Sequence, residues 1–327
     1  MTDNIKEIPE NEVTPEQEVP AEVPPVTNEP QKESEKRIDA ITKKQLVKKV
    51  FVNIALYTFL TVMAVIVIFP FYWMLMSSVK TIAEYNRAVP TMWPKKFEWA
   101  TYKIAFNNIN FGTVFLNTVL VGVVSTILSL VITVLSAYAF ARFNFKGKGI
   151  LFAGMLATMM IPGELFTITN YVTVVRLFGM TQTEIGTFSA LILPFLVSVF
   201  YISLLRQNFM QIPNELYLAA KVDGTSDLKY LWKVMIPLAA PTLISITILK
   251  MMGAWNTYIW PNLIVGSNSR WELMTVALRN ANWGEDALFN YPAQMAAVVI
   301  VTLPLLILFL CFRKYIIRGV SRSGIKG

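Results

Sequence analysis

Four stretches of the chain contain no Asp, Glu, Lys or Arg and are long enough to cross a lipid bilayer. They comprise residues 50–79, 104–141, 185–205 and 287–312. A membrane-spanning helix needs about 20 mostly apolar residues, because the hydrocarbon interior offers no water to the backbone polar groups. Two further spans are predicted if each contains one charged residue, Glu164 in the first and Lys250 in the second. The sequence therefore predicts an all-α integral membrane protein with six transmembrane helices.

The predicted spans have bounds at about 52–77, 113–140, 149–171, 185–205, 238–265 and 291–312. A composition of 54% hydrophobic and 15% charged residues is typical of an integral membrane protein and not of a soluble domain. The chain has no His and a single Cys, Cys311. A disulfide framework and Cys/His metal sites are thereby excluded, and we predict no metal site.

The N-terminal segment differs from the rest of the chain in charge and in proline content. Residues 1–35 hold ten Asp/Glu and two Lys/Arg, and six prolines precede position 31. We expect residues 1–45 to form a disordered, acidic tail and residues 46–327 to form the transmembrane domain. With the N-terminus in the cytoplasm, the predicted cytoplasmic segments carry 18 Lys/Arg and the external segments carry 8. Basic residues concentrate on the cytoplasmic side, so both termini are predicted to be cytoplasmic.

A polar segment on the predicted cytoplasmic side, residues 206–237, has the pattern of two short helices joined by a sharp turn. Pro213 and Glu215 suit the first turn of a helix. Asp223-Gly224 suits its end, because Gly readily takes the left-handed conformation that follows many helices. Thr225 or Ser226 can then cap the next helix. That second helix is predicted to place four apolar residues on one face, namely Leu228, Leu231, Trp232 and Met235.

This segment resembles the signature loop of inner-membrane permeases of ATP-binding-cassette (ABC) importers. That loop has the pattern A-A-x-x-D-G, nine residues, an aliphatic residue, one residue, a second aliphatic residue and Pro. The matching positions are Ala219, Ala220, Asp223, Gly224, Val234, Ile236 and Pro237. "FPFYWMLMSSVK" at 69–80, "SAYAFARFNFKGK" at 136–148, "MMIPGE" at 159–164, "GAWNTYIWP" at 253–261 and the closing "GIKG" are also similar to the second permease subunit of maltose-type importers.

The resemblance implies that the chain has the type I importer permease fold and that the loop is a coupling helix, which docks on a separate cytoplasmic ATPase. The residues expected to couple to the ATPase are Glu215, Leu218, Ala219, Ala220, Asp223, Gly224 and Pro237. The family usually has Glu immediately before the two alanines, whereas this chain has Leu218. In the family, that Glu is expected to form an ion pair with the ATPase. In this chain, Glu215 or an apolar contact is expected to take its place. An amphipathic loop that only rests on the membrane surface is the alternative for this segment.

ATP hydrolysis is not expected in this chain, because it contains no G-x-x-x-x-G-K-[ST] phosphate-binding loop. We expect it to bind no cofactor and to have no catalytic residues; ATP and Mg²⁺ belong to partner ATPase subunits. The resemblance also implies a homologous permease as heterodimer partner, two ATPase subunits, an extracellular solute-binding protein and a carbohydrate substrate. It further implies a multi-pass protein in the lipid bilayer of a bacterial or archaeal cytoplasmic membrane. No nucleic-acid partner is expected.

Candidate substrate-path residues are those that are polar or aromatic within the spans, near predicted helix breaks. They are Trp255, Asn256, Tyr258, Glu164 and Lys250. Pro162-Gly163 is predicted to interrupt the third span. Glu164 and Lys250 are both expected deep in their spans, where they either pair with each other or are satisfied separately by water. Trp260 is expected in the aromatic belt at the membrane surface.

The last external loop, residues 266–294, is long for a connection. By resemblance, Asn280, Asn282 and Trp283 are candidates for contact with the solute-binding protein; a plain external loop is the alternative. The leading prediction for the whole chain is a permease subunit of an ATP-driven sugar importer. An autonomous secondary transporter or channel for a small polar solute is the main alternative. A membrane-embedded enzyme is disfavoured, because the spans hold no paired carboxylates and no His.

Overall fold

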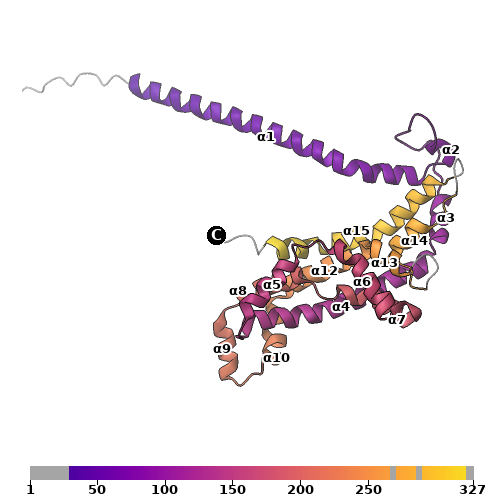
Figure 1. Ribbon diagram of the computed structural model, residues 1–327. Coiled ribbons are helices and arrows are strands. Elements are labelled where there is room, and N and C mark those ends of the chain that lie inside the picture. Colours follow the sequence, from indigo (N-terminus) through magenta and orange to yellow (C-terminus); the bar gives the residue numbers. More distant parts are fainter. Residues whose placement is uncertain (1–28, 266–269, 285–288, 322–327) are drawn as a thin grey trace, which may run out of the picture. The chain divides into compact units, whose positions relative to one another are not determined.

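The computed structural model describes residues 29–265, 270–284 and 289–321 (Figure 1). The chain divides into two compact units, Met1–Val67 and Ile68–Gly327. Helix α1, Glu29–Ser78, begins in the first unit and ends in the second. Helix α1 thus includes residues 29–45, which were assigned to the tail; the sequence from 31 to 45 has neither Pro nor Gly and is rich in helix-favouring Lys, Glu and Gln. Residues 1–28 lie outside the described part.

All regular elements in the described part of the second unit are helical. The longer helices are α3 (Ala100–Asn108), α4 (Phe111–Arg142), α5 (Lys148–Thr158), α7 (Glu184–Ile192), α8 (Val199–Gln211), α9 (Asn214–Val222), α12 (Ala240–Asn256) and α15 (Tyr291–Ser321). The shorter ones include α2 (Ile82–Tyr85), α6 (Thr167–Tyr171), α10 (Asp227–Tyr230), α11 (Ile236–Leu238), α13 (Ile259–Val265) and α14 (Met274–Asn280). Short 3₁₀ and π-helical turns connect several of them.

By length and composition, the described part of the chain holds up to six spans if two helices joined at a bend are counted as one. Lys48–Ser78, Phe111–Arg142 and Tyr291–Lys314 are continuous and apolar enough to cross a membrane. Three further pairs are bent, Lys148–Thr158 with Gly163–Leu177 by 88°, Glu184–Phe195 with Val199–Gln211 by 53°, and Asp227–Leu238 with Ala240–Asn256 by 80°. The predicted third, fourth and fifth spans are thus not continuous helices.

Prolines lie at or beside each bend. Pro162 precedes the 3₁₀ turn Gly163–Phe166, as predicted for the third span. Pro194 lies in the 3₁₀ turn Leu193–Phe195, and Pro241 lies in the first turn of α12. Because Pro has no N–H and its ring clashes with the preceding turn, a helix does not continue unbroken into these positions.

Helix α4 contributes to every hydrophobic cluster of the second unit. Val114 belongs to a cluster with α3, α14 and α15, and Val121 to one with α7 and α13. Tyr138 belongs to the cluster that α4 forms with α8 and with residues 230–246. A second row of α4 residues, also buried, consists of small hydroxyl side chains, namely Thr118, Ser125, Thr126, Ser129 and Thr133. Small side chains allow neighbouring membrane helices to approach α4 closely.

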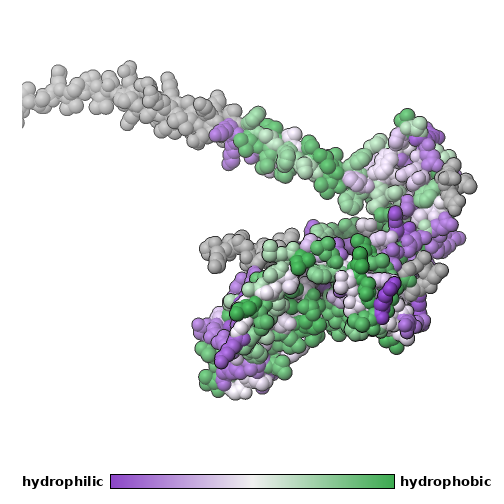
Figure 2. All heavy atoms as spheres, viewed as in Figure 1, coloured by the Kyte–Doolittle hydropathy of each residue, from purple (hydrophilic) through white to green (hydrophobic). Residues whose placement is uncertain are grey.

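The face of the second unit that Figure 2 shows is largely apolar between two more polar ends. On α4, exposed apolar residues include Leu116, Leu120, Val123 and Ile127. On α15, they include Leu303, Leu306, Ile307 and Leu310. Hydrophilic residues gather around α9 and α10 and around α3 and α14. This distribution suits helices whose outer faces contact lipid or another apolar subunit.

Candidate functional site

Helix α9 is a short, well-terminated helix in the polar segment that the sequence singled out. Pro213 is its N-cap, Glu215 lies in its first turn, and Gly224 follows it with φ +69°. The Gly224 N–H donates to the Lys221 carbonyl at 3.1 Å, and the Thr225 N–H donates to the Ala220 carbonyl at 2.8 Å. These two bonds form a Schellman motif, which requires the left-handed residue that Gly supplies. The predicted turn at Asp223-Gly224 is confirmed.

The two faces of α9 have different surroundings. Tyr217 and Ala220 pack against the cluster shared by α4 and α8. The opposite face is exposed and follows the helical spacing of Glu215, Leu218, Ala219 and Val222. The Leu218 side chain is 55% exposed and that of Val222 is 88% exposed. Six of the seven predicted coupling positions are therefore exposed, and Ala220 alone is half-buried and turned inward. The exposed positions are Glu215, Leu218, Ala219, Asp223, Gly224 and Pro237.

The helix after the turn is capped as predicted, but its buried face differs from the prediction. The Ser226 hydroxyl accepts from the Lys229 N–H at 3.4 Å. Leu231 and Met235 are fully buried, whereas Leu228 and Trp232 are exposed. The predicted apolar face was based on regular α-helical spacing. The Leu231–Met235 segment is a π-helical turn, which changes the angular position of side chains along it.

Asp227, the first residue of α10, holds this helical pair together. Its Oδ1 accepts from the Tyr217 hydroxyl at 2.9 Å and from the Tyr138 hydroxyl at 3.1 Å. Its Oδ2 accepts from Lys221 Nζ at 2.9 Å, and this bond raises the pKa of the Lys221 ammonium above its ordinary value. Tyr138 lies on α4 and is buried. One carboxylate thus joins α9, α10 and the end of α4.

Arg142, at the end of α4, makes the second connection. Its guanidinium donates to the carbonyls of Phe209 at 3.2 Å and Ile212 at 2.8 Å, and to the Asn214 side chain at 3.3 Å. A helix leaves its last carbonyls unpaired, and Arg142 satisfies them at the end of α8. The sequence analysis missed Tyr138, Arg142 and Asp227. Their signal in the sequence is weak, because an acid in a first helical turn and a basic residue after a span both have ordinary explanations.

A second carboxylate, Glu84, organises the loop that follows α1. Its side chain accepts from the Thr91 hydroxyl at 2.7 Å and from the Lys95 N–H at 3.0 and 3.1 Å. Lys80 Nζ donates to the Thr91 carbonyl at 2.5 Å and lies 4.4 Å from the Trp73 ring centroid. Burial opposes ionisation of Glu84, but these hydrogen bonds and the Lys80 charge outweigh it, and the pKa of Glu84 lies below its ordinary value. Lys80, counted above as a basic residue of an external loop, is fully buried.

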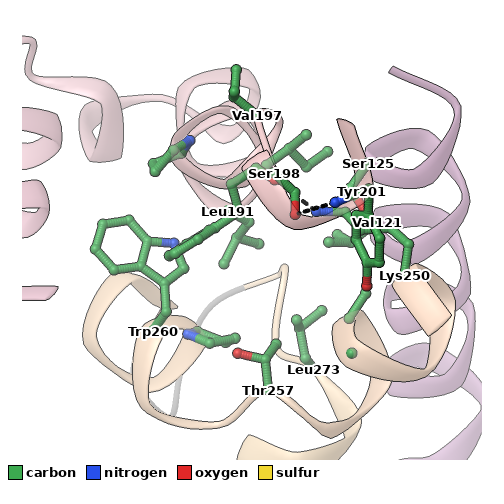
Figure 3. Close-up of a pocket in the computed structure, with 16 residues that line it drawn as sticks. Val121, Ser125, Leu191, Val197, Ser198, Tyr201, Lys250, Thr257, Trp260 and Leu273 are labelled. Atoms are coloured by element: carbon green, nitrogen blue, oxygen red, sulfur yellow. Dashed lines mark hydrogen bonds between the residues drawn. The ribbon is translucent and has the colours of Figure 1, made fainter. Parts of the chain in front are cut away.

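Lys250 lies on α12 and lines a cavity of about 380 Å³ (Figure 3). Its Nζ donates to the Phe195 carbonyl at 2.6 Å, at the break between α7 and α8. Glu164 is exposed in its 3₁₀ turn, and among the described residues it forms no ion pair with Lys250. Glu164 and Lys250 therefore do not pair with each other in the structure.

The aromatic residues proposed for the path take different positions. Trp255 is buried, and its indole N–H donates to the Val301 carbonyl at 3.3 Å. Trp260 is also buried, donates to the Ala190 carbonyl at 3.1 Å and lines the Lys250 cavity. Trp255 thus packs in the core of the second unit, and Trp260 does not belong to a surface belt. Asn256 is exposed and Tyr258 is half-buried.

The candidate contact residues of the last loop are also divided. Asn280 and Asn282 are exposed, and the Asn282 carbonyl accepts from the Asn108 side chain at 2.5 Å. Trp283 is buried in the cluster of α3, α14 and α15, so its side chain is not open to a partner. Residues 266–269 and 285–288 of this loop lie outside the described part.

Comparison with known proteins identifies the family of this chain. Residues 129–322, more than half of the chain, match the family described as the inner membrane component of binding-protein-dependent transport systems. The chain belongs to this family. The match contains α9, the Asp227 carboxylate, Arg142 and Lys250.

Relatives of this inner membrane component align over most of their length. It is 29% identical to the arabinooligosaccharides transport system permease protein AraQ of Bacillus subtilis over 84% of this chain and 96% of that protein. It is 30% identical to the inner membrane ABC transporter permease protein YcjP of Escherichia coli over 86% of this chain and 99% of that protein.

A solved structure shares the fold of this inner membrane component. A bacterial ABC transporter involved in the import of the acidic polysaccharide alginate matches with a TM-score of 0.70 and 24% identity, over 80% of this chain and 95% of that one. The predicted all-α permease fold is confirmed. The protein is a multi-pass ABC importer permease, and its energy comes from ATP hydrolysis in separate subunits.

Proposed function

We propose that this permease forms, together with a homologous permease subunit, the path by which a saccharide crosses a bacterial or archaeal cytoplasmic membrane. Support for a saccharide comes from relatives named for arabinooligosaccharides, diacetylchitobiose and lactose. Two ATPase subunits supply the energy, and an extracellular solute-binding protein delivers the substrate. This chain itself binds neither ATP nor another cofactor.

The exposed face of α9 is the observation that supports ATPase docking. An unpartnered row that contains Leu218 and Val222 is costly to leave in water, and burial of each side chain in a complex stabilises it by about 1.5–3 kcal/mol. Exposed Leu216, Leu228 and Trp232 extend the apolar surface around this row. Leu218 makes the contact more apolar than the ion pair that Glu would form at the same position.

The anchoring of α9 supports a mechanical role. A docked ATPase would move α9, and Asp227 and Arg142 connect α9 to α4 and α8. Since α4 contributes to all three hydrophobic clusters, its displacement repacks the interior of the second unit. Alternating access of the path to the two sides of the membrane follows from two such packings, and ATP binding to the partner shifts the balance between them.

Cysteine cross-linking tests the docking claim. In a Cys311→Ser background, Leu218→Cys and Val222→Cys are expected to cross-link to the ATPase subunit in membranes through a short bis-maleimide. Ala220→Cys, which faces the interior, is the matched control and is expected to react far less. If no position from 214 to 224 cross-links in either the presence or the absence of ATP, α9 is not the docking helix.

The substrate class has its own test. The purified complex, reconstituted with its solute-binding protein, is expected to show ATPase activity stimulated by one class of saccharide. Uptake of that saccharide into proteoliposomes would require ATP and the binding protein. Uptake by this chain alone, without an ATPase, would contradict the proposal and favour a secondary transporter.

A further inference from the structure

The Lys250 cavity lies where the continuous helix α4 meets two broken segments of the second unit. Its walls come from α4, from the break between α7 and α8, and from α12 with the start of α13. Figure 3 shows Lys250 and Tyr201 on one side of the cavity and Trp260 on the other. With a volume of about 380 Å³, it is near the lower end of the range for small-molecule sites, about 300–1,000 Å³. Such a volume suits a single sugar unit.

Lys250 is the one charged residue among those that line the cavity in the described part of the chain. An ammonium group has three N–H donors, and the Phe195 carbonyl accepts from one of them. The described residues provide no carboxylate partner for Lys250. A charged side chain within a membrane span costs about 2.5–3.5 kcal/mol on insertion scales. A neutral amide could satisfy the Phe195 carbonyl without that cost, so the charge itself calls for an explanation.

Further polar groups surround the same space. The Tyr201 hydroxyl has no hydrogen-bond partner among the described residues, and Ser125, Ser198 and Thr257 also line the cavity. Helix α8 begins beside it, with Ser198 as N-cap. Trp260 offers an aromatic face. Hydroxyl groups and an aromatic ring suit a sugar, whose rim is polar and whose ring faces carry C–H groups.

We propose that this cavity is a subsite for an acidic sugar unit, with the Lys250 ammonium pairing with its carboxylate. The substrate of the importer is then an acidic saccharide. Because the subsite must open to the transport path, this inference rests on the proposed function. An anionic lipid headgroup offers the same charge, and the experiment below separates the two sources.

Thiol modification of the assembled transporter in lipid nanodiscs tests the charge preference directly. In a Cys311→Ser background, Ser198→Cys places a thiol on the cavity wall. The anionic reagent sulfonatoethyl methanethiosulfonate is expected to react at least about ten-fold faster than its cationic trimethylammonium analogue, which corresponds to about 1.4 kcal/mol of electrostatic preference. The exposed position Thr113→Cys provides the control for intrinsic reagent reactivity.

Substitutions at Lys250 separate the charge from the fold. Lys250→Gln retains a donor for the Phe195 carbonyl and is expected to reduce the rate ratio to that of the Thr113 control. Lys250→Arg retains the charge and is expected to keep the preference. Equal rates for the two reagents at Ser198→Cys, or a ratio that Lys250→Gln leaves unchanged, would overturn the proposal. So would the absence of labelling in the nucleotide-free and in the ATP-bound states alike.

Protection from labelling identifies the source of the anion. Millimolar galacturonate is expected to slow the reaction of Ser198→Cys, whereas galactose, which differs in the carboxylate, is expected to have much less effect. Protection by phosphatidylglycerol in the nanodisc, with no effect of galacturonate, would overturn the sugar subsite in favour of a lipid site. The cross-linking of α9 and the ATP-dependent uptake of a neutral saccharide would be unaffected by that result, so the two proposals can fail separately.

Discussion

Glu84 and Asp227 are two carboxylates that each hold a short helical segment in place, yet their hydrogen bonds reach different distances along the chain. The partners of Glu84, Thr91 and Lys95, lie 7 and 11 residues away in the same loop. Asp227 accepts from Tyr217 and Lys221 in its own segment, but also from Tyr138, which lies 89 residues away on α4. Glu84 therefore fixes the shape of one loop, whereas Asp227 joins α9 and α10 to α4.

The difference has a functional meaning. A carboxylate with only local partners contributes to stability and to the shape of a surface. A carboxylate that bridges a surface helix and a membrane helix can also transmit a displacement between them. Substitution of Glu84 should therefore change stability more than coupling, and substitution of Asp227 should change coupling more than stability.

The largest expected effect is that of Asp227→Leu, which removes all three hydrogen bonds at once. The two tyrosine hydroxyls contribute about 1 kcal/mol each and the exposed Lys221 pair adds little, so uptake is expected to fall at least about ten-fold. ATPase activity of the complex should fall less than uptake, because α9 still docks but no longer moves α4. Asp227→Asn, which keeps an acceptor for the tyrosines, should retain more uptake. Equal losses of uptake and ATPase activity would contradict a coupling role.

Arg142→Met is expected to have the next largest effect. It removes a donor from the carbonyls of Phe209 and Ile212, of which Phe209 keeps the Ile212 N–H at 3.4 Å. The cost is about 1–3 kcal/mol, and the start of α9 is freed from the end of α4. Lower melting temperature and a several-fold loss of uptake are expected, and Arg142→Lys should recover part of both. Unchanged uptake in a destabilised Arg142→Met protein would show that Asp227 alone carries the connection.

For Glu84 the expected effect is on stability and depends on pH. Its pKa in the folded protein lies below 4.5, so its ionisation stabilises the fold above that pH, and this contribution is lost as pH falls through the folded-state pKa. Glu84→Gln should lower the melting temperature near neutral pH and reduce its difference from the value at a pH below the folded-state pKa. The ratio of uptake to ATP hydrolysed should stay unchanged. A changed ratio would remove the contrast with Asp227.

A finer comparison uses the two tyrosines that share Asp227 Oδ1. Tyr138→Phe and Tyr217→Phe each remove one hydroxyl, with a stability cost of about 1 kcal/mol. Only Tyr138 links to α4, so Tyr138→Phe should lower the uptake per ATP more than Tyr217→Phe. Melting temperatures and uptake of both single variants and the double variant measure this. Equal uptake in the two single variants would place the connection elsewhere.

The smallest effect is expected for Lys221→Met. The Lys221–Asp227 ion pair has substantially exposed side chains, and such pairs contribute little because water and salt screen them. Melting temperature and uptake should stay close to those of the unchanged protein at physiological ionic strength. A large loss would mean that Lys221 orients Asp227 toward the tyrosines.

What the sequence could predict followed from local chemistry. The apolar spans, the break at Pro162-Gly163 and the turn at Gly224 depend on composition or on the backbone of one residue, and each is present. The prediction of which residues are buried in the helix after Ser226 was wrong for Leu228 and Trp232, because a π-helical turn there changes the spacing of side chains. Trp255 and Trp283 were assigned to a path and a surface because aromatic character does not reveal which side of a helix is packed.

The residues that connect α9 to α4 and α8, namely Tyr138, Arg142 and Asp227, were not predicted, for a different reason. The bond between Tyr138 and Asp227 depends on how α4 and α10 pack, and nothing near either residue records it. The Phe195 carbonyl that holds Lys250 becomes available only through a helix break 55 residues earlier in the chain. Such partners follow from tertiary structure, which one sequence does not specify residue by residue.

The position of α4 in every cluster has a consequence for biosynthesis. The ribosome produces α4 before α8, α12 and α15, so the helix enters the membrane before most of its packing partners exist. Each cluster draws residues from beyond position 240, and a nascent chain that ends there can complete none of them. The hydroxyl side chains on α4 therefore lack their final packing partners until late in translation. The hydrophobic clusters of the second unit then form together, after residue 240 has been synthesised.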